Sequence, residues 1–192
     1  APVNLVVIGG RYIAPPTTTG ATTVLMGINT TTAGVTNNAE LIFLEDGEND
    51  VATTDNPSLE RLTPLDTNPV VNIGLKSVVT VPKKVTTPTI INPAATTLKA
   101  TAASGAFSGT FALTDDDPTT VIVKADEVKR SVTFQGLIIR HRLPNNSTTE
   151  YGVGYFVIDQ MPQNTNPPPP TTKNSPKLSG LTIFKPLGAT LP

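Results

Sequence analysis

Few residues of this 192-residue chain are of types that perform chemistry, and their surroundings argue against catalysis. The chain has one histidine, His141, and no cysteine. A Ser–His–Asp triad would need His141 as its base, but this residue lies between Arg140 and Arg142, just before the turn-forming sequence 144–147. Without cysteine there is no thiolate nucleophile, thiolate metal site or disulfide. No glycine-rich phosphate loop or catalytic carboxylate motif is present, so we expect a protein that is not an enzyme.

One group of acidic residues is dense enough to be a candidate metal site. Asp115, Asp116 and Asp117 are consecutive, and two more acidic residues follow at 126–127. Carboxylate oxygens at close spacing are ligands that calcium accepts. The spacing matches no EF-hand, and an aspartate directly before Pro118 also favours a turn. We therefore keep the three aspartates as a calcium candidate, with a solvated turn as the alternative, and expect no other cofactor.

The aromatic residues offer a second kind of site. Aromatic rings form platforms for sugars, but most of these rings recur at the spacing of two that turns them to one face of a strand, which favours packing in a core. Tyr12, Tyr151 and Tyr155 are the rings to test for a ligand, and Tyr151 and Tyr155 are the two ligand candidates that we retain. Asn145–Thr148 matches the N-glycosylation pattern. Because the chain is rich in Asn and Thr, we interpret this segment first as a turn, with glycosylation as the alternative.

The elements that must position these residues are strands. Three apolar runs, Phe107–Leu113, Arg130–Arg140 and Tyr151–Ile158, are separated by polar, turn-rich linkers. Their period of two predicts three strands of an antiparallel meander. Glycines such as Gly136 and Gly152 would let neighbouring strands or aromatic rings approach closely, or would place bulges. Further strands are predicted at 3–8, 22–30, 40–45, 70–81 and 177–187, and weaker patterns predict edge strands at 85–91 and 97–102, in view of Pro88 and Pro93. We expect an all-β fold: an antiparallel sandwich or barrel, immunoglobulin-like or jelly-roll-like, open to completion by a strand from a neighbouring subunit.

The order of these runs suggests a domain plan. Residues 1–20 would be an N-terminal strand and linker, 21–163 the β-sandwich core, 164–176 a proline-rich linker, and 177–192 a C-terminal strand. The linker contains Pro167–Pro170, a stiff and extended spacer. A spacer of this kind lets the last strand cross to the far side of the domain, or leave for another molecule. Whether the core is one β domain or two is left open by the chain length.

The amino-acid composition indicates which partners and which location to expect. The net charge is −1 and charged residues make up only 15% of the chain, which excludes the basic footprint of a nucleic-acid-binding protein. No apolar run reaches the roughly 18 residues of a membrane-spanning helix. The surface is rich in Thr, Asn and Pro and poor in Lys, and Ala1 follows the pattern left by signal-peptide cleavage. We expect a secreted protein located at a cell surface.

Five short motifs resemble a β-rich segment near the C-termini of large secreted surface proteins of environmental Gram-negative bacteria. They are Phe107–Phe111, Asp115–Pro118, Arg130–Gly136, Gly152–Phe156 and Ser175–Gly180. The resemblance covers the last two-fifths of the chain. It implies a non-catalytic module displayed at a surface, and it supplies no catalytic or binding residues.

These observations lead to two hypotheses about function. The first is a structural subunit of an extracellular filament or surface fibre, which assembles head-to-tail with copies of itself by strand complementation. Its contacts would come from the two apolar end strands. The residues of this expected polymer interface are Val3, Leu5, Val7, Leu178, Leu181 and Ile183. The second hypothesis is an adhesin or carbohydrate-binding module with a glycan or surface partner.

Overall fold

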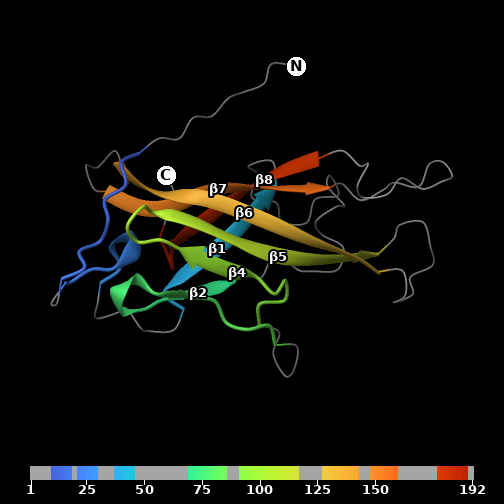
Figure 1. The fold of residues 1–192 in the computed structure, drawn as a ribbon, viewed down its shortest axis with the longest axis horizontal. Coiled ribbons are helices and arrows are strands. Elements are labelled where there is room, and N and C mark those ends of the chain that lie inside the picture. Colours follow the sequence, from blue (N-terminus) through green and yellow to red (C-terminus); the bar gives the residue numbers. More distant parts are fainter. Residues whose placement is uncertain are drawn as a thin grey trace, which may run out of the picture.

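The computed structural model of the chain is all-β, as expected. It describes residues 10–18, 21–29, 37–45, 69–85, 91–116, 127–142, 148–159 and 177–189. The elements are the strands β1 (Ala39–Glu45), β2 (Val70–Ile73), β3 (Val79–Thr80), β4 (Thr97–Ala100), β5 (Ala106–Asp116), β6 (Glu127–Arg142), β7 (Thr148–Asp159) and β8 (Lys177–Pro186), with short 3-10 turns η1 (Leu25–Gly27) and η2 (Leu75–Ser77) (Figure 1).

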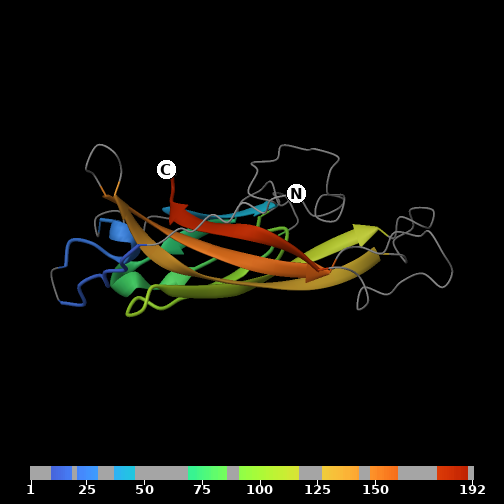
Figure 2. The ribbon, with the colours of Figure 1, turned by 90° about the horizontal axis from the view of Figure 1, so that it is seen from above.

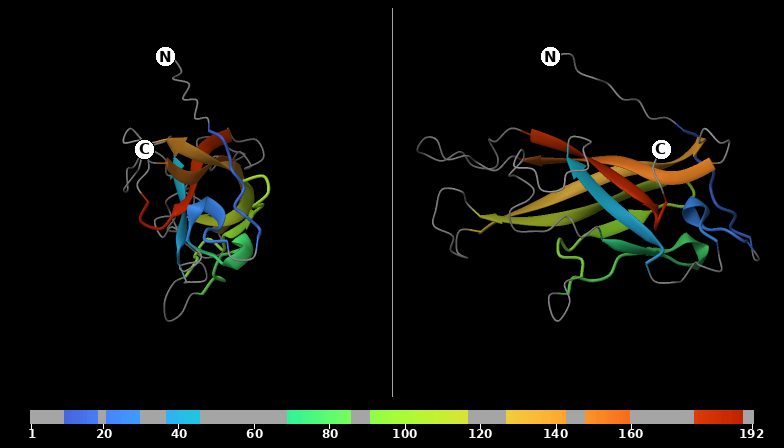
Figure 3. Two further views of the ribbon diagram at one scale, coloured as in Figure 1. Left: turned by 90° about the vertical axis from the view of Figure 1, so that its left-hand side faces the viewer. Right: turned by 180° about the vertical axis from the view of Figure 1, so that it is seen from behind.

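The eight strands form one antiparallel sheet that curls into a nearly closed barrel. Their order in the sheet is β3-β2-β1-β8-β7-β6-β5-β4. Consecutive strands are therefore neighbours everywhere except between β3 and β4, and β8 returns to pair with β1. The view along the long axis shows the strands surrounding a common interior (Figure 3). A barrel closes when its two edge strands pair. Here the edges are β3 and β4, and no ladder joins them among the described residues.

The expected meander is confirmed and forms the longest part of the wall. β5, β6 and β7 pair in succession, with Phe107 opposite Gly136 and Gly136 opposite Gly154. These strands, together with β8, are long and strongly twisted, as the view from above shows (Figure 2). Strand β1 confirms the run at 40–45, and β4 confirms the expected edge strand at 97–102.

Phenylalanine fills the barrel. All six phenylalanines of the chain are buried, and they come from five strands of the wall. The ring of Phe43 in β1 lies 4.4 Å from that of Phe111 and 5.2 Å from that of Phe134, measured between centroids. Phe107 contacts Phe184 at 5.8 Å across the other part of the core. Tilted and edge-to-face contacts of this kind add to the free energy of burial.

Glycines make room for one of these rings. A Cβ atom on Gly136 would overlap the ring of Phe107 and the carbonyl oxygen of Val153, and one on Gly152 would lie 2.7 Å from the Phe107 ring. The wall of β6 and β7 can therefore approach Phe107 only where it carries no side chain. The expectation that these glycines allow close approach is confirmed.

The segment expected as a strand at 22–30 folds differently. A bridge between Thr23 and Asn29 closes a tight turn around η1, which lies at one end of the barrel (Figure 3). Gly27 has a φ of 68°, a conformation that favours glycine and turns the chain back. Val24, Leu25, Met26 and Ile28 are buried there. The apolar run covers the end of the core instead of adding to its wall.

Two further expectations are wrong for related reasons. The long run at 70–81 is interrupted by η2, where Gly74 N–H donates to the Val78 carbonyl and the chain reverses, so the run forms two strands. The strand at 177–187 does not cross the domain after the proline-rich segment, because β8 pairs directly with β7, with Asp159 opposite Lys177. It belongs to the barrel wall. The strand expected at 3–8 and the segment 160–176 lie outside the described residues, and 85–91 is described only as a bridge between Val85 and Ile91.

Within the part of the chain that the structure describes, no helix has the length and apolar character needed to cross a membrane.

The glycine that faces Phe107 gives a direct test of this packing. Gly136→Ala should lower the free energy of unfolding by about 2 kcal/mol, because the ring or the strand must move. Gly74→Ala is the matched control, since its Cβ would meet only the Val78 carbonyl oxygen at 3.7 Å, and it should change stability by less than about 0.5 kcal/mol. Urea denaturation measures both. Equal stability of the two variants would contradict the packing described for Phe107.

Candidate functional site

The edges of β3 and β4 form an open seam in the barrel. Thr101 N–H donates to the Ala106 carbonyl at 2.8 Å, and hydrogen bonding alternates along an antiparallel ladder. The backbone groups of Leu98 and Ala100 therefore point away from β5, toward the seam. By the same alternation, the bond from Gly74 to Val78 turns the backbone groups of Val79 toward the seam from the other side. No backbone hydrogen bond engages these outward groups within the described residues.

Asn92 holds the seam at one end. Its side-chain amide donates to the carbonyls of Pro82, at 2.8 Å, and Thr96, at 2.9 Å, and its Oδ1 accepts from Thr96 N–H at 2.7 Å. Pro82 follows β3 and Thr96 precedes β4, so one buried side chain joins the two edges where no ladder does. Asn92 has a φ of 48°, which asparagine tolerates better than other residues with a Cβ.

The surface around the seam is hollow and partly apolar. A groove of about 300 Å³ runs between the two edges, lined by the segments 81–84 and 95–98 and by Asn92. Val78, just before β3, is 57% exposed, and Val85 and Ile91 nearby are also exposed. Val79, Val81 and Leu98 are partly buried against the core. An open edge with apolar side chains beside it is a template for another strand.

The N-terminal segment is fixed to a different strand. Arg11 forms a bridge with Arg140 of β6. The bridge lies beyond Leu137, where the ladder between β5 and β6 has ended. The Tyr12 hydroxyl donates to the Ala102 carbonyl, and the Tyr12 ring packs on Gly105. Because the bridge is antiparallel, the chain from Tyr12 back to Gly10 runs along β6 away from the seam.

An ion pair and two tyrosines with raised pKa values lie in or beside this segment. Glu150 forms an ion pair with Arg140, with 2.7 Å between Oε1 and Nη2. Burial raises the pKa of Tyr12 above its usual value of 10.0, and the negative charge of Glu150 raises it further. Burial also raises the pKa of Tyr151. The hydroxyl of Tyr12 is therefore protonated at neutral pH and available as a donor.

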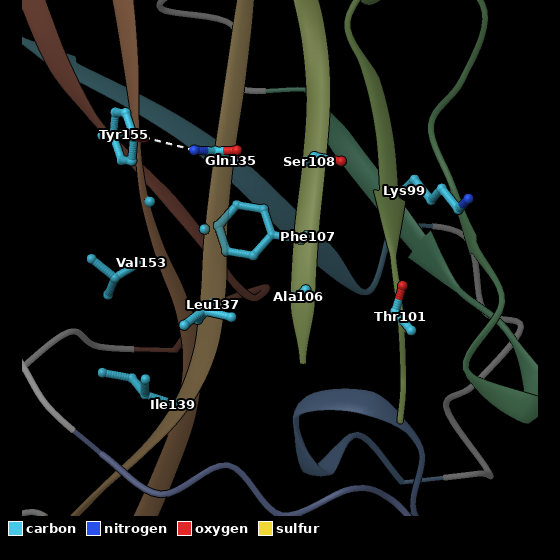
Figure 4. Close-up of a pocket in the computed structure, with 12 residues that line it drawn as sticks. Lys99, Thr101, Ala106, Phe107, Ser108, Gln135, Leu137, Ile139, Val153 and Tyr155 are labelled. Carbon is cyan, nitrogen blue, oxygen red and sulfur yellow. Dashed lines mark hydrogen bonds between the residues drawn. The ribbon is translucent and has the colours of Figure 1, made fainter. Parts of the chain in front are cut away.

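A second hollow lies on the outward face of β4 to β7 (Figure 4). It is a groove of about 690 Å³, and its lining side chains include Lys99, Ser108, Leu137 and Tyr155. Gln135 Nε2 donates to the Tyr155 hydroxyl at 2.6 Å, which fixes the ring at the groove's edge. Leu137 and Tyr155 are 56% and 53% exposed, which is high for residues of their size in a sheet face.

The structure separates the two tyrosines expected as ligand contacts. Tyr155 lines the groove, whereas Tyr151 is only 5% exposed and its ring lies 6.4 Å from that of His141. Tyr151 is placed to pack, not to meet a ligand. His141 itself lies at the end of β6, half-buried.

The expected polymer-interface residues of the last strand lie inside the sheet. Leu178, Leu181 and Ile183 belong to β8, which pairs with β1 on one side and β7 on the other. Residues 180–184 of this strand are paired on both sides, and residues 177–179 are paired with β7. Val3, Leu5 and Val7, the N-terminal members of the set, lie outside the described residues.

The calcium candidate is described only in part. The backbones of Asp115 and Asp116 belong to β5, opposite Val128 and Glu127, while Asp117 lies outside the described residues. No group of three or more acidic or histidine side chains able to hold a metal occurs in the described ranges. Calcium binding at Asp115–Asp117 stays a prediction.

Sequence reasoning missed Asn92, Tyr12 and Gln135 as positioning residues. Asn92 precedes Pro93, a pair typical of turns, and that signal could have marked a specific backbone conformation there. Nothing local to Tyr12 or Gln135 predicts their partners, which lie 90 and 20 residues away.

No protein-family model, curated protein or solved structure matches this chain.

Removing the Asn92 amide should loosen the seam. Asn92→Gly keeps the backbone conformation accessible but leaves the carbonyl of Pro82 and the N–H of Thr96 without their partner, so we expect a loss of about 2 kcal/mol in the free energy of unfolding. Asn92→Ala should lose about 1 kcal/mol more, because alanine is strained at positive φ. Thermal and urea denaturation measure both variants. A Gly variant as stable as the parent chain would contradict the role of the amide.

The raised pKa of Tyr12 predicts a loss of stability at alkaline pH. Below pH 10 the hydroxyl is protonated in the folded and unfolded chains, and the stability is full. As pH rises through 10, the unfolded chain loses its proton first, so the free energy of unfolding falls. Tyr12→Phe should reduce this fall, measured as Tm between pH 8 and pH 11. Tyr155→Phe, which removes an exposed hydroxyl, is the control. An unchanged pH profile in Tyr12→Phe would contradict the assignment.

Proposed function

We propose that the protein is a non-enzymatic structural subunit of an extracellular filament or surface fibre, which assembles by donating its N-terminal strand to the next copy. The observation that carries the proposal is the seam between β3 and β4, the one place in the described sheet order where neighbouring edges are not joined by a ladder. Added strands bind such edges through main-chain hydrogen bonds, and pockets for alternate side chains fix the register.

The donor in this proposal is Val3–Ile8. Its sequence, Val-Asn-Leu-Val-Val-Ile, is strongly β-prone, and Val3, Leu5 and Val7 alternate at the period of a strand with one buried face. Leu98 and Ala100 supply partly buried side chains on the acceptor edge. Burying each donor side chain contributes about 1.5–3 kcal/mol, in addition to the hydrogen bonds gained by the edge.

The position of the described N-terminal residues favours donation to another copy. Arg11 and Tyr12 are held beside β6, and from Tyr12 to Gly10 the chain runs away from the seam of its own barrel. A strand that leaves one subunit and completes another makes a heterologous contact, which does not close and so builds fibres. The C-terminal strand β8 is not the donor that we propose, because every residue of it is paired within its own sheet and residues 180–184 are paired on both sides.

The proposed setting rests on composition and on the resemblance of residues 107–180 to segments of secreted surface proteins. The low charge content and the Thr- and Asn-rich surface fit an extracellular fibre subunit. The absence of a catalytic motif in the sequence fits a structural role.

Deleting residues 1–10 should abolish assembly. The intact chain should form filaments in negative-stain microscopy and elute early in size exclusion, whereas the truncated chain should elute as a monomer or lose its fold. Filaments of the truncated chain, or monomers of both with the same β-sheet circular dichroism, would contradict strand donation.

Cysteine pairs locate the donor strand more sharply, since the chain has no cysteine of its own. Lys99 points outward, and a strand added at the seam would approach it in a non-hydrogen-bonded pair, where side chains lie closest. Asn4→Cys, Val6→Cys and Ile8→Cys place thiols on the outward face of the donor. Mixed with Lys99→Cys chains under mild oxidation, one of them should give disulfide-linked dimers.

The matched acceptor control is Thr133→Cys, because Thr133 is exposed on β6 and its backbone is already paired with Thr110 of β5, away from the seam. Cross-linking to Thr133→Cys as efficient as to Lys99→Cys would indicate random collision and contradict the assigned edge.

A further inference from the structure

The groove on the outward face of β4 to β7 has two chemically different walls. One wall, from β6 and β7, is mainly apolar and carries Leu137, Val153 and the exposed ring of Tyr155, with Gln135 as its polar member. The other wall, from β5 and the segment 99–101, carries the polar side chains of Lys99, Thr101 and Ser108 beside Ala106 and Phe107. The close-up shows these two sets on opposite sides of the hollow (Figure 4).

We propose that this groove binds an oligosaccharide that carries a carboxylate group. A sugar ring has an apolar face of C–H groups and an edge of hydroxyls, and it matches a site with an aromatic platform on one side and hydrogen-bonding groups on the other. The volume of about 690 Å³ lies within the range of specific ligand sites. The inference does not rest on the proposed assembly, because the groove is lined by outward side chains of β4 to β7, whereas the seam consists of backbone groups at the edges of β3 and β4; the two share only β4.

Tyr155 is prepared for this role before any ligand arrives. Its hydroxyl accepts the 2.6 Å hydrogen bond from Gln135, so the ring is held in place although it is 53% exposed. An aromatic side chain fixed in this way loses little conformational freedom on binding. Val157, two residues further along the same face of β7, is 46% exposed and extends the apolar surface.

The positive charge of Lys99 favours an acidic sugar over a neutral one. Among the described residues that line the groove, Lys99 is the only charged one and none is acidic. Among the ion pairs described, none involves Lys99. A cation at the polar wall without an acidic neighbour in the groove favours a ligand with a carboxylate, such as a uronic acid unit, over a neutral sugar.

The test is titration calorimetry of the intact chain with tetragalacturonate and, as the neutral counterpart, cellotetraose. We expect binding of the acidic sugar, weakened about tenfold by Tyr155→Ala through loss of the platform. Lys99→Gln should weaken the acidic sugar by about threefold at low salt, with the difference vanishing in 1 M NaCl. Leu187→Ala, which alters an exposed apolar side chain outside the groove, is the matched control and should bind like the parent chain.

Several outcomes would overturn the proposal. Absence of binding for both sugars at millimolar concentration, or binding unaffected by Tyr155→Ala, would remove the groove as a sugar site. Equal affinity for the two sugars, insensitive to Lys99→Gln, would overturn the assignment of an acidic ligand. If no sugar binds and Tyr155→Ala changes the sedimentation of the chain, the groove is an interface between copies. Failure of filament formation with sugar binding intact would leave this inference standing and contradict only the proposed assembly.

Discussion

An antiparallel sheet must either pair the backbone groups of its edge strands or leave them to water and to other strands, and this constraint governs the molecule. The chain meets it by curling eight strands so that β8 returns to β1. The remaining edges, β3 and β4, approach each other but are joined in the described residues by the side chain of Asn92 and not by a ladder. The barrel therefore encloses a core while the edges of β3 and β4 stay unjoined by a ladder, and the proposed assembly depends on these edges.

The packing of the phenylalanine core determines where the strands of the wall carry glycine. The phenylalanine rings need an interior wide enough to hold them, and Phe107 reaches its place only because β6 and β7 carry Gly136 and Gly152 beside it. The same strands turn Leu137 and Tyr155 outward. Core and outward groove thus share one stretch of sheet, in which alternation assigns every second residue to each task. A substitution on the inner face of these strands should therefore also affect the groove on their outer face.

The sequence predicted the all-β class, the meander of β5 to β7 and the burial of the phenylalanines, because a period of two over long runs is a strong local signal. It could not predict that the apolar run around Leu25 caps the barrel instead of entering the sheet, since burial in a turn and burial in a strand need the same side chains. The position of β8 between β1 and β7 was also beyond reach, because pairing across more than 130 residues leaves no local trace. Tyr155 was found by its type, whereas its groove depends on strands that only the fold brings together.

The most direct test of the account is amide hydrogen exchange, followed residue by residue in monomeric and assembled fractions of the intact chain. The amides of Lys99 and Thr101 point toward β5, so they should exchange slowly in both fractions. The amides of Leu98 and Ala100 face the seam, so they should exchange fast in the monomer and become protected on assembly, as a strand from the next copy pairs with them. Fast exchange of Leu98 and Ala100 in assembled material would contradict the claim that the seam receives a donated strand.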